Sequence, residues 1–484
     1  SRLTRLYLQI CFKIIFLSIK MGELSMDIDA VNAGEHFTQS EITADVAENI
    51  QDVVVNEEIA YNYPSLFTSK TLIELSNSSW ARSKKAKGDV QPYLRGCKWS
   101  PDGTCCLTVV NNDGIHVTEL SRDLYTGSAA PDRIIDIMDS VIHVKEAGLI
   151  YDFCWFPLMN SGVPESCCWL TTRQNGPIQM WDAFDGSLRC SYRGFDAVDQ
   201  MEPALSLTFT RDGSRIIAGY KKFMRTFDVE RPGRDFAEHK ISSAAACFDT
   251  CDNLLAVGSW NTSISLYNVN EMGAYKSIGK MHGHSGGVTQ VKFSPDGLRL
   301  ISGARKDHRL LIWDIRYYRR PLNILTRVVD TNQRIYFDLS PCGKYLVTGG
   351  TDGVVKVWDE DNFPLHQDCC NSISIHPLRP ILATGSGQYH IADPLLSPEK
   401  KSNGASGVPI ALTEKSSNGT GGGVPIASRE EGSNETNDDS TIITEDMDSA
   451  DSDNQQSIDV DMKYSDTSEN NLVFWWIGEV PDMS

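Results

Sequence analysis

One pattern recurs along the middle of the chain and limits what the chain can fold into. In the clearest copies an apolar strand is followed by a turn such as SPDG, a second apolar strand, a short loop, and a third strand ending on an aromatic residue and an acid. Seven copies are recognisable, at 96–120, 153–184, 207–229, 246–269, 291–315, 337–360 and 373–391. From the second copy on, the third-strand aromatics lie 46, 40, 46 and 45 residues apart, at Trp181, Phe227, Tyr267, Trp313 and Trp358.

This period predicts an all-β fold, a seven-bladed WD-repeat β-propeller. Repeats of about 40–45 residues with four strands each are typical of propeller blades. A single four-stranded blade cannot bury both of its faces, so blades stack side by side, and closing them into a ring leaves no terminal blade exposed. The seven third strands therefore predict seven blades.

The last repeat predicts how the ring closes. Its first two strands fall at 373–385, but its third strand falls at 471–477, and only seven residues follow. The outer strand of this blade must then come from upstream of the first repeat, within 69–75 or 79–82. We expect deletion of that segment to unfold the ring.

The segments outside the repeats are acidic and polar. Residues 21–60 hold ten acidic and no basic residues, and residues 391–470 hold seventeen acidic and five basic ones. Such segments cannot bury enough apolar surface to offset their ordering entropy, so we predict that both are disordered. The apolar stretch before Met21 is interpreted as read-through of untranslated sequence, with Met21 or Met26 as the start. The predicted parts are a disordered or non-native N-terminus, the propeller, a disordered acidic insert and a closing strand, at 1–60, 61–391, 392–470 and 471–478.

The net charge of the chain does not argue against a nucleic-acid partner. The formal value is −19, but the acidic segments carry it, and residues 61–390 have a net charge of about +1. Net charge bears on association and solubility rather than on fold. The repeats are therefore close to neutral, and local patches of charge decide what they attract.

Cysteine usage and hydropathy indicate a reducing compartment and no membrane span. Thirteen cysteines include the neighbours Cys105–Cys106, Cys167–Cys168 and Cys369–Cys370, and adjacent residues of a strand point to opposite faces. No CxxC or Cys/His spacing typical of a metal site occurs, so we predict reduced, buried cysteines and no metal, in the nucleus or cytosol. No apolar run reaches the ~18 residues of a membrane span.

No motif of an enzyme or of a cofactor site is present. The chain lacks a P-loop, a G-x-S-x-G and an H-E-x-x-H motif, and the glycine-rich GTGGGV at 419–424 reads as a linker. The fifth repeat keeps four polar residues that are predicted to hydrogen-bond across one blade as an architectural network: His284, Ser302, Asp307 and Trp313. We therefore predict a binding module with no catalytic residue and no cofactor.

Basic residues gather in loops that are predicted to open on one face of the ring. These are the loops between second and third strands and the loops that enter the first strands. Cations on such a face contact phosphates, and interleaved aromatic rings stack on unpaired bases, which favours folded or single-stranded RNA; ordinary solvated charge is the alternative. The predicted RNA-binding residues are Arg173, Lys221, Lys222, Arg225, Trp260, Arg305, Lys306, Arg334 and Tyr336.

Several strings go beyond a generic WD repeat and resemble one family. GARKDHRLLIWDIR, TNQRIYFDLSPCGKYLVTGG, NGPIQMWDAFDGSLR and HPLRPILATGSGQ are similar to segments of the telomerase Cajal body proteins. The resemblance covers residues 61–390 and 471–478 and leaves out the acidic flank and the insert.

The resemblance implies a function and partners. It implies a propeller that recognises the Cajal body box of small Cajal body RNAs, and telomerase RNA where that RNA carries the box. It further implies location in the nucleus and Cajal body, with some protein in the cytoplasm. The implied partners are coilin, the survival motor neuron protein, H/ACA ribonucleoproteins including dyskerin, and the cytosolic chaperonin for folding.

Two other functions fit parts of the sequence. WDIR at 313–316 matches the docking pattern of substrate receptors of cullin-type ubiquitin ligases, although Trp313 is required by the repeat and Arg316 is a single residue. A purely structural protein scaffold is the third reading. RSKKAKG at 82–88 reads either as a nuclear import signal or as a solvated turn.

Overall fold

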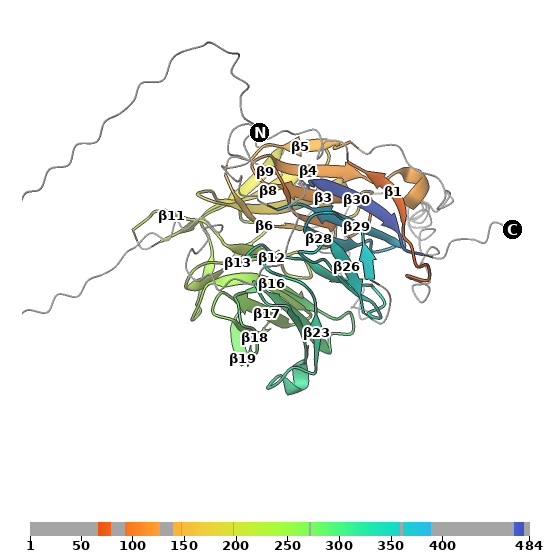
Figure 1. Cartoon of the computed structure of the whole chain (residues 1–484). Helices are drawn as coiled ribbons and strands as arrows, with labels where there is room; N and C mark the ends of the chain where they lie inside the picture. The colour runs from red at the N-terminus through yellow and green to blue at the C-terminus, as the bar shows by residue number, and fades with distance from the viewer. Residues whose placement is uncertain are drawn as a thin grey trace, which may run out of the picture. The chain divides into compact units, whose positions relative to one another are not determined.

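Antiparallel four-stranded sheets repeat seven times in the described part of the chain (Figure 1). The computed structural model describes residues 66–78, 92–125, 139–146, 148–196, 198–270, 273–358, 362–388 and 469–478. We number the sheets as blades one to seven in chain order. The predicted segment 1–60 and residues 392–468 of the predicted insert 392–470 lie outside the described residues. The predicted C-terminal bound of the insert is corrected, because Glu469 is ordered by its contacts with His366 and Gln367.

The first three blades each follow the chain without a crossover. The strands of blade one are β2 (Leu94–Trp99), β3 (Cys105–Val110), β4 (Gly114–Glu119) and β5 (Ile142–Val144). The strands of blade two are β6 (Ile150–Trp155), β7 (Cys168–Arg173), β8 (Ile178–Asp182) and β9 (Leu188–Tyr192). The strands of blade three are β12 (Ser206–Phe209), β13 (Arg215–Gly219), β14 (Phe223–Asp228) and β15 (Ala237–Lys240).

The next three blades have the same strand order. The strands of blade four are β16 (Ala245–Cys251), β17 (Leu254–Ser259), β18 (Ser263–Val269) and β19 (Tyr275–His282). The strands of blade five are β20 (Val288–Phe293), β21 (Arg299–Ala304), β22 (Arg309–Asp314) and β23 (Asn323–Thr326). The strands of blade six are β24 (Phe337–Leu339), β25 (Leu346–Thr348), β26 (Val354–Val357) and β27 (Asn362–Pro364).

Blade seven joins the two ends of the described chain. Its order is β1 (Ile73–Asn77), β30 (Asn471–Trp476), β29 (Ile381–Ser386) and β28 (Cys370–Ile375). β1 pairs antiparallel with β30, and the two lie side by side in Figure 1, β1 in orange and β30 in blue. The predicted closure is confirmed: the outer strand comes from upstream and overlaps the first of the two predicted segments, 69–75.

The remaining elements are short. They are α4 (Arg122–Tyr125), the 3₁₀ turns η2 (Pro164–Ser166) and η3 (Ile315–Tyr317), and the two-stranded hairpin of β10 (Gly194–Phe195) and β11 (Met201–Glu202). None of the helices among the described residues has the length and apolarity to cross a bilayer.

The apolar core is divided into seven clusters, each between two neighbouring blades, and one smaller cluster. Strand alternation produces this arrangement, because successive side chains of one blade face its two neighbours in turn. Cys106 lies in the cluster between blades seven and one, and Cys105 in the cluster between blades one and two. The predicted opposite orientation of neighbouring cysteines is confirmed, and all twelve cysteines among the described residues are free thiols.

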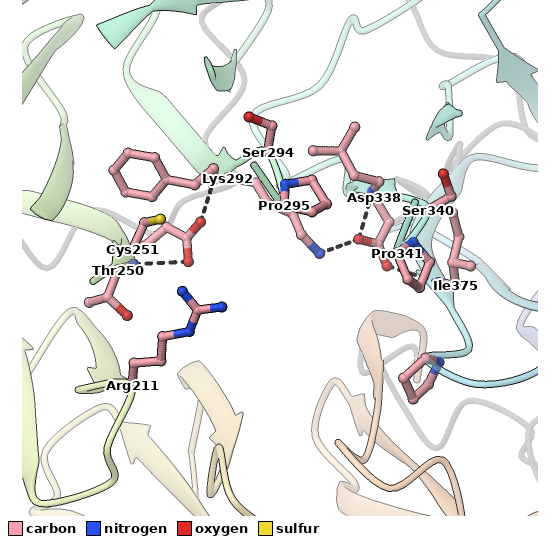
Figure 2. A pocket seen from close by; sticks show the side chains of 14 residues that line it. Arg211, Thr250, Cys251, Lys292, Ser294, Pro295, Asp338, Ser340, Pro341 and Ile375 are labelled. Carbon is pink, nitrogen blue, oxygen red and sulfur yellow. Dashed lines mark hydrogen bonds and ion pairs between the residues drawn. The ribbon is translucent and has the colours of Figure 1, made fainter. Parts of the chain in front are cut away.

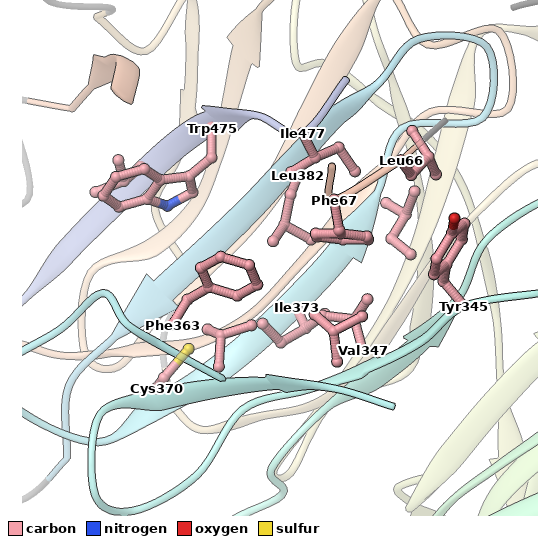
Figure 3. Close-up of a cluster of buried hydrophobic side chains, with 14 of the residues drawn as sticks. Leu66, Phe67, Tyr345, Val347, Phe363, Cys370, Ile373, Leu382, Trp475 and Ile477 are labelled. Carbon is pink, nitrogen blue, oxygen red and sulfur yellow. The ribbon is translucent and has the colours of Figure 1, made fainter. Parts of the chain in front are cut away.

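The residues just before β1 belong to the core between blades six and seven. Leu66 and Phe67 are almost fully buried, and the Phe67 ring meets the edge of the Tyr345 ring at 5.5 Å between centroids. The Phe67 backbone N–H donates to the carbonyl of Ile477 at 2.7 Å. Figure 3 shows Leu66 and Phe67 beside Tyr345 and Ile477. Upstream residues therefore close the ring by core packing as well as by strand pairing.

Polar networks tie the loops to the strands in two blades. In blade five, His284 contacts Asp307 at 2.9 Å and Ser302 at 2.8 Å, and the Trp313 indole N–H donates to Ser302 at 2.9 Å. In blade seven, His366 contacts Thr384 at 2.8 Å, and the Trp475 indole N–H donates to the same hydroxyl at 2.8 Å.

The acid of the blade seven network comes from beyond the insert. The Glu469 carboxylate accepts from His366 at 3.2 Å and from the backbone N–H of Gln367 at 2.7 Å. Sequence inspection missed this network because its acid stands 85 residues after Thr384, on the far side of the insert.

Candidate nucleic-acid interface

Loops from blades three, four and five meet at one end of the ring. In an antiparallel sheet, the turn between the second and third strands lies at the same end as the connection entering the first strand. Backbone hydrogen bonds join these loops in series: Trp260 N–H donates to Ala244 O at 3.1 Å, Arg305 N–H to Gly287 O at 3.0 Å, and Lys306 N–H to Thr331 O at 3.2 Å. We call this end of the ring the loop face.

Trp260 and Arg305 form the centre of the candidate site. The Arg305 guanidinium lies 5.4 Å from the Trp260 ring centroid, within cation–π range. Trp260 is 38% exposed, which is high for an indole, and Arg305 is half-buried. The Arg305 Nε has no hydrogen-bond partner among the described residues. An exposed ring and an unsatisfied cationic donor are therefore presented together.

Burial and a second arginine both disfavour the charge on Arg305. Desolvation lowers its pKa from the ordinary value, and the positive charge of Arg334 lowers it further. An approaching anion offsets both unfavourable effects, because an opposite charge stabilises the charged guanidinium. A phosphate is an anion of the required sign.

Three lysines of the loop face carry exposed charge. Lys221 and Lys222 lie between β13 and β14 of blade three, and Lys306 follows Arg305 in blade five. All three are exposed, and among the described residues none of their ammonium groups forms an ion pair. The structure thus brings together five of the nine predicted residues on consecutive blades, Lys221, Lys222, Trp260, Arg305 and Lys306.

Arg225 is not a surface cation, and the prediction of a phosphate contact there is corrected. Its side chain is 3% exposed and forms ion pairs with Glu202 at 3.0 Å and Glu238 at 2.9 Å. Its guanidinium also stacks 4.3 Å from the Tyr220 ring centroid. The position within β14 places the side chain on the face that packs against blade two, under the β10–β11 hairpin, where it donates to Phe195 O.

Arg334 and Tyr336 are also placed differently from the prediction. Arg334 reaches across the axis of the ring, with an ion pair to Asp152 of blade two at 3.1 Å and a hydrogen bond to Ala246 O of blade four at 3.1 Å. Tyr336 is 5% exposed, and its hydroxyl accepts from Arg334 at 3.2 Å. A ring this buried cannot stack on a base, and the Arg334 charge is already paired with Asp152, so the predicted RNA contacts of both residues are corrected.

Arg173 lies on the loop face, and its charge is neutralised by an ion pair with Glu146. Its Nε is 3.1 Å from a carboxylate oxygen of Glu146, whose side chain is 4% exposed. Burial raises the pKa of Glu146, and the arginine opposes that rise. A contact between Arg173 and RNA stays a prediction, and it would have to compete with this pair.

Arg95 and Tyr151 are candidates that sequence inspection missed. Each sits at a β-bulge near the start of the first strand of its blade, between Leu94 and Gly96 and between Ile150 and Asp152. Bulges re-aim side chains near functional sites. Arg95 Nη1 is buried without a hydrogen-bond partner among the described residues, and its charge opposes the rise that burial causes in the pKa of Tyr151. In the sequence, Arg95 in LRGCKW and Tyr151 in LIYDFCW occupy equivalent positions of their repeats, and this equivalence could have identified both residues.

The opposite end of the axis has a different character. Its hollow is lined by first strands and turns of blades three to seven, including Arg211, Asp249, Lys292 and Asp338. Figure 2 shows Lys292 paired with Asp338 in this hollow. Burial raises the pKa of Asp249 to about 6. Because opposite charges neutralise one another there, this end offers no continuous cationic surface.

Within the WDIR turn, Arg316 forms an ion pair with Asp314 of the same turn. Arg316 donates from Nε and Nη2 to the two oxygens of Asp314, at 3.0 and 2.8 Å. Asp314 also caps η3 by accepting from the Arg316 backbone N–H. The guanidinium remains exposed, but its carboxylate partner is already satisfied, and no further feature singles this turn out as a docking site.

Known proteins share this repeat. The family model described as "WD domain, G-beta repeat" matches residues 275–314 and 331–359. A Drosophila melanogaster protein named "Telomerase Cajal body protein 1 homolog" is 43% identical over 351 residues, covering 70% of this chain and 64% of the relative. The Homo sapiens "Telomerase Cajal body protein 1" is 38% identical over 342 residues, covering 66% and 61%.

A more distant similarity extends to another class. The Schizosaccharomyces pombe "Guanine nucleotide-binding protein negative regulator 1" is 25% identical over 285 residues, covering 55% of this chain and 70% of that protein. The chain spans less than two thirds of the length of the Drosophila and human relatives. The predicted family resemblance is confirmed, and the predicted ubiquitin-ligase docking is not favoured by any of these names.

Proposed function

This WD-repeat chain is homologous over its propeller to the telomerase Cajal body proteins, and on that basis we propose that it is a non-enzymatic RNA-binding scaffold. Its ligand is the Cajal body box of small Cajal body RNAs, and telomerase RNA where that RNA carries the box. The RNA binds on the loop face across blades three to five. The protein then directs the bound RNA to Cajal bodies.

One observation carries this proposal. Trp260 is exposed beside Arg305, whose Nε has no hydrogen-bond partner in the part of the chain that the structure describes, and three lysines without an ion pair there lie on blades three and five. Base–aromatic stacking contributes about 1–3 kcal/mol per base, and cations along the groove hold the backbone. RNA loops offer both an unstacked base and phosphates at short spacing. The arrangement matches that ligand class.

The mechanism contains no chemical step. Trp260 stacks on a base that is turned out of the loop, and Arg305 contacts a phosphate or a guanine edge beside it. Lys221, Lys222 and Lys306 hold phosphates on either side. Arg95 and Tyr151 extend the surface towards the axis of the ring.

The cellular setting of this proposal comes from the named relatives. It places the protein in the nucleus and Cajal body, with some in the cytoplasm. The proposed partners are H/ACA ribonucleoproteins including dyskerin, coilin and the survival motor neuron protein, and the cytosolic chaperonin during folding.

A pair of double variants tests the site. Arg305→Glu with Lys306→Glu reverses two charges on the loop face, and Arg319→Glu with Arg320→Glu reverses two exposed charges at the opposite end of blade five. We expect the first to abolish crosslinking to a box-bearing RNA hairpin and the second to leave crosslinking intact, both with an unchanged melting temperature. Equal crosslinking of the two variants would remove the loop face from the site.

The salt dependence of binding separates phosphate contacts from base contacts. On single strands, each neutralised phosphate contributes about −0.7 to the slope of log K against log salt. Lys306→Ala should make this slope shallower by that amount and weaken box and mutant-box RNAs equally. Trp260→Ala should leave the slope unchanged and weaken binding at the turned-out base.

A further inference from the structure

Three side chains with metal-ligand atoms meet at the outer edge of blade one. Asp113 lies in the turn after β3, His116 lies on β4, and His143 lies on β5. Their ligand atoms all lie within 4.8 Å of one another. His116 Nε2 is 2.9 Å from one Asp113 carboxylate oxygen, and His143 Nε2 is 3.4 Å from the other. None of these residues takes part in the proposed RNA site.

The sheet itself sets this geometry. His116 and His143 are direct partners in the β4–β5 register, so their side chains leave the sheet on the same face. Their rings lie 4.1 Å apart between centroids and are nearly parallel. Gly114, at φ +107°, brings the turn against β5: a Cβ there would lie 2.2 Å from Val144 O. The carboxylate of Asp113 is thereby held beside both imidazoles.

The hydrogen bonds around His116 favour a cation, either a proton or a metal ion, between its Nε2 and the Asp113 carboxylate. Ser140 donates its single hydroxyl hydrogen to Ile142 O at 2.6 Å, so its oxygen accepts from His116 Nδ1 at 3.1 Å. With the proton of the neutral ring on Nδ1, a lone pair of Nε2 faces the Asp113 carboxylate. Two opposed lone pairs are favourable only if a second proton or a metal ion lies between them.

We propose that Asp113, His116 and His143 bind a divalent transition-metal ion of the Zn²⁺ class. Zinc takes imidazole nitrogens and carboxylate oxygens at about 2.0–2.2 Å in a tetrahedron, which places ligand atoms roughly 3.3–3.5 Å apart. The observed nitrogen–oxygen separations of 2.9 and 3.4 Å are close to that spacing, and the stacked imidazoles must rotate apart for both Nε2 lone pairs to converge on one ion. Two imidazoles and one carboxylate suit zinc, nickel or copper rather than calcium or magnesium.

The remaining contacts also fit such an ion. Ser140 fixes the ring of His116 from the side away from the ligands, as partners of metal-bound histidines commonly do. His143 Nε2 donates to Asp113 O at 2.9 Å, and on binding of the ion this proton passes through solvent to Nδ1, which frees the Nε2 lone pair for the ion. His143 is 29% exposed and His116 only 3%, so the ion enters from the side of His143.

Binding would fasten the outer strand of blade one. β5 is three residues long and follows the connection from β4, so it holds few ladder hydrogen bonds of its own. An ion shared by the turn, β4 and β5 cross-links all three. The site is therefore structural, and its loss should loosen blade one without altering the proposed RNA site.

The sequence contained no recognised spacing for this site. His116 and His143 are 27 residues apart, and pairing in the sheet alone brings them together. The expectation of no metal is revised by this proposal.

The test is metal binding by the full chain. Protein stripped with a chelator is titrated with Zn²⁺ by calorimetry and with Co²⁺ by absorption, and its melting temperature is measured with and without Zn²⁺. His143→Gln is the main variant, because that side chain is the most exposed of the three. Asp113→Asn is the second variant, for use if the first folds poorly.

His308→Gln is the matched control. His308 Nε2 lies 3.2 Å from an Asp330 carboxylate oxygen, and among the described residues this pair has no third ligand to complete a set. We expect the wild type and His308→Gln to bind about one ion and gain thermal stability. His143→Gln and Asp113→Asn should bind at least tenfold more weakly and lose that gain.

Two results would overturn the proposal. The first is a wild type that binds no ion at micromolar concentration, in which case a second proton on His116 satisfies the network. The second is binding that persists in both variants. A Co²⁺ spectrum with intense near-ultraviolet thiolate absorption would assign that persistent binding to cysteines. RNA crosslinking is unaffected by either result, so this test and that of the RNA site fail independently.

Discussion

At the scale of single residues, buried carboxylates determine which arginines remain available to bind a ligand. Arg225 and Arg334 are paired with carboxylates inside the fold, while Arg305 retains a donor that no described residue satisfies. A sequence shows that an arginine is near a loop, but not which carboxylate the fold will bring to it. Leaving a buried charge unpaired costs several kcal/mol, so nearby acids recruit cations away from the surface.

His376 should make the closure between blades one and seven sensitive to acid. Its Nε2 donates to Gly103 O at 2.8 Å, and its Nδ1 accepts from the backbone N–H groups of Leu378 and Arg379 at 3.0 and 2.9 Å. Burial lowers its pKa from 6.5 to about 4. Because the folded pKa is depressed, the unfolded chain takes up a proton first, and stability falls as pH drops from 6.5 towards 4.

The measurement is the melting temperature of wild type and His376→Gln between pH 7.5 and pH 4.5. Between pH 7.5 and pH 4.5 the shift corresponds to a loss of about 2–3 kcal/mol. We expect the variant to be less stable at pH 7.5 but to lose less on acidification. His282→Gln, which alters an exposed histidine, should follow the wild-type profile. Parallel profiles for wild type and His376→Gln would show that this residue does not carry the effect.

Gly286 should matter to RNA binding although it carries no charge. A Cβ at this position would lie 2.0 Å from the backbone oxygen of Arg305, so Gly286→Ala must displace one of the two loops. We expect RNA affinity to fall by about tenfold, or ~1.4 kcal/mol. Gly162→Ala, where a Cβ meets only the Asn160 side chain, is the control, read by electrophoretic mobility shift with a box-bearing hairpin. Unchanged affinity in Gly286→Ala would mean that the position of Arg305 is unimportant.

At the scale of the elements, hydrogen bonds to Asp368 hold together the residues on the two sides of the insert, and we call Asp368, Gln388 and Glu469 the insert frame. Asp368 accepts from the Gln388 side chain at 2.9 Å and from the Glu469 backbone N–H at 3.4 Å, so the residues on both sides of the insert are held by one carboxylate. Glu469 then completes the network of His366, Thr384 and Trp475. The blade seven network is thus built across a gap of about eighty residues in sequence.

Because the insert frame holds the two ends together, we expect that most of the insert can be removed without unfolding the propeller. Residues 391–466 would be replaced by a short Gly/Ser linker, keeping Gln388 and Glu469. Because the two ends are already adjacent, shortening the loop reduces its closure entropy and should leave the melting temperature equal or slightly higher. A matched chain with the same deletion and Glu469→Ala should melt lower by several degrees. If the shortened chain itself unfolds, the insert frame does not hold the ends.

The elements were more predictable than the site. The SPDG-type turns and alternating apolar residues give each blade its first three strands, because both signals are local. The position of β1 was predicted only within two segments, since a strand is not specified by its own residues when its partner is hundreds of residues away. The bulges at Arg95 and Tyr151 and the pairing of His116 with His143 depend on register, which no local pattern fixes.

At the scale of the whole molecule, closing the ring is the step on which all seven blades depend. β1 and β30 pair although nearly 400 residues separate them in sequence. Contacts at such separation form late and leave edges exposed until they do, which is a physical argument in favour of the chaperonin partner proposed above. Leu75 meanwhile is fully buried in the core between blades seven and one, and Phe67 in the core between blades six and seven.

Two truncations test this dependence. A chain beginning at residue 62 keeps Leu66, Phe67 and β1, whereas a chain beginning at residue 79 loses all three. Removing one buried Leu or Phe side chain costs about 2–5 kcal/mol, and a domain has only about 5–15 kcal/mol in total. The longer chain should therefore melt cooperatively at the wild-type temperature, while the shorter one, with the edge of β30 uncovered, should aggregate or show no transition in calorimetry. Adding a peptide of residues 62–78 in trans should restore part of the transition, because the peptide supplies the missing strand. A shorter chain that melts like the longer one would mean that blade seven is stable with three strands and that the ring does not need its upstream strand.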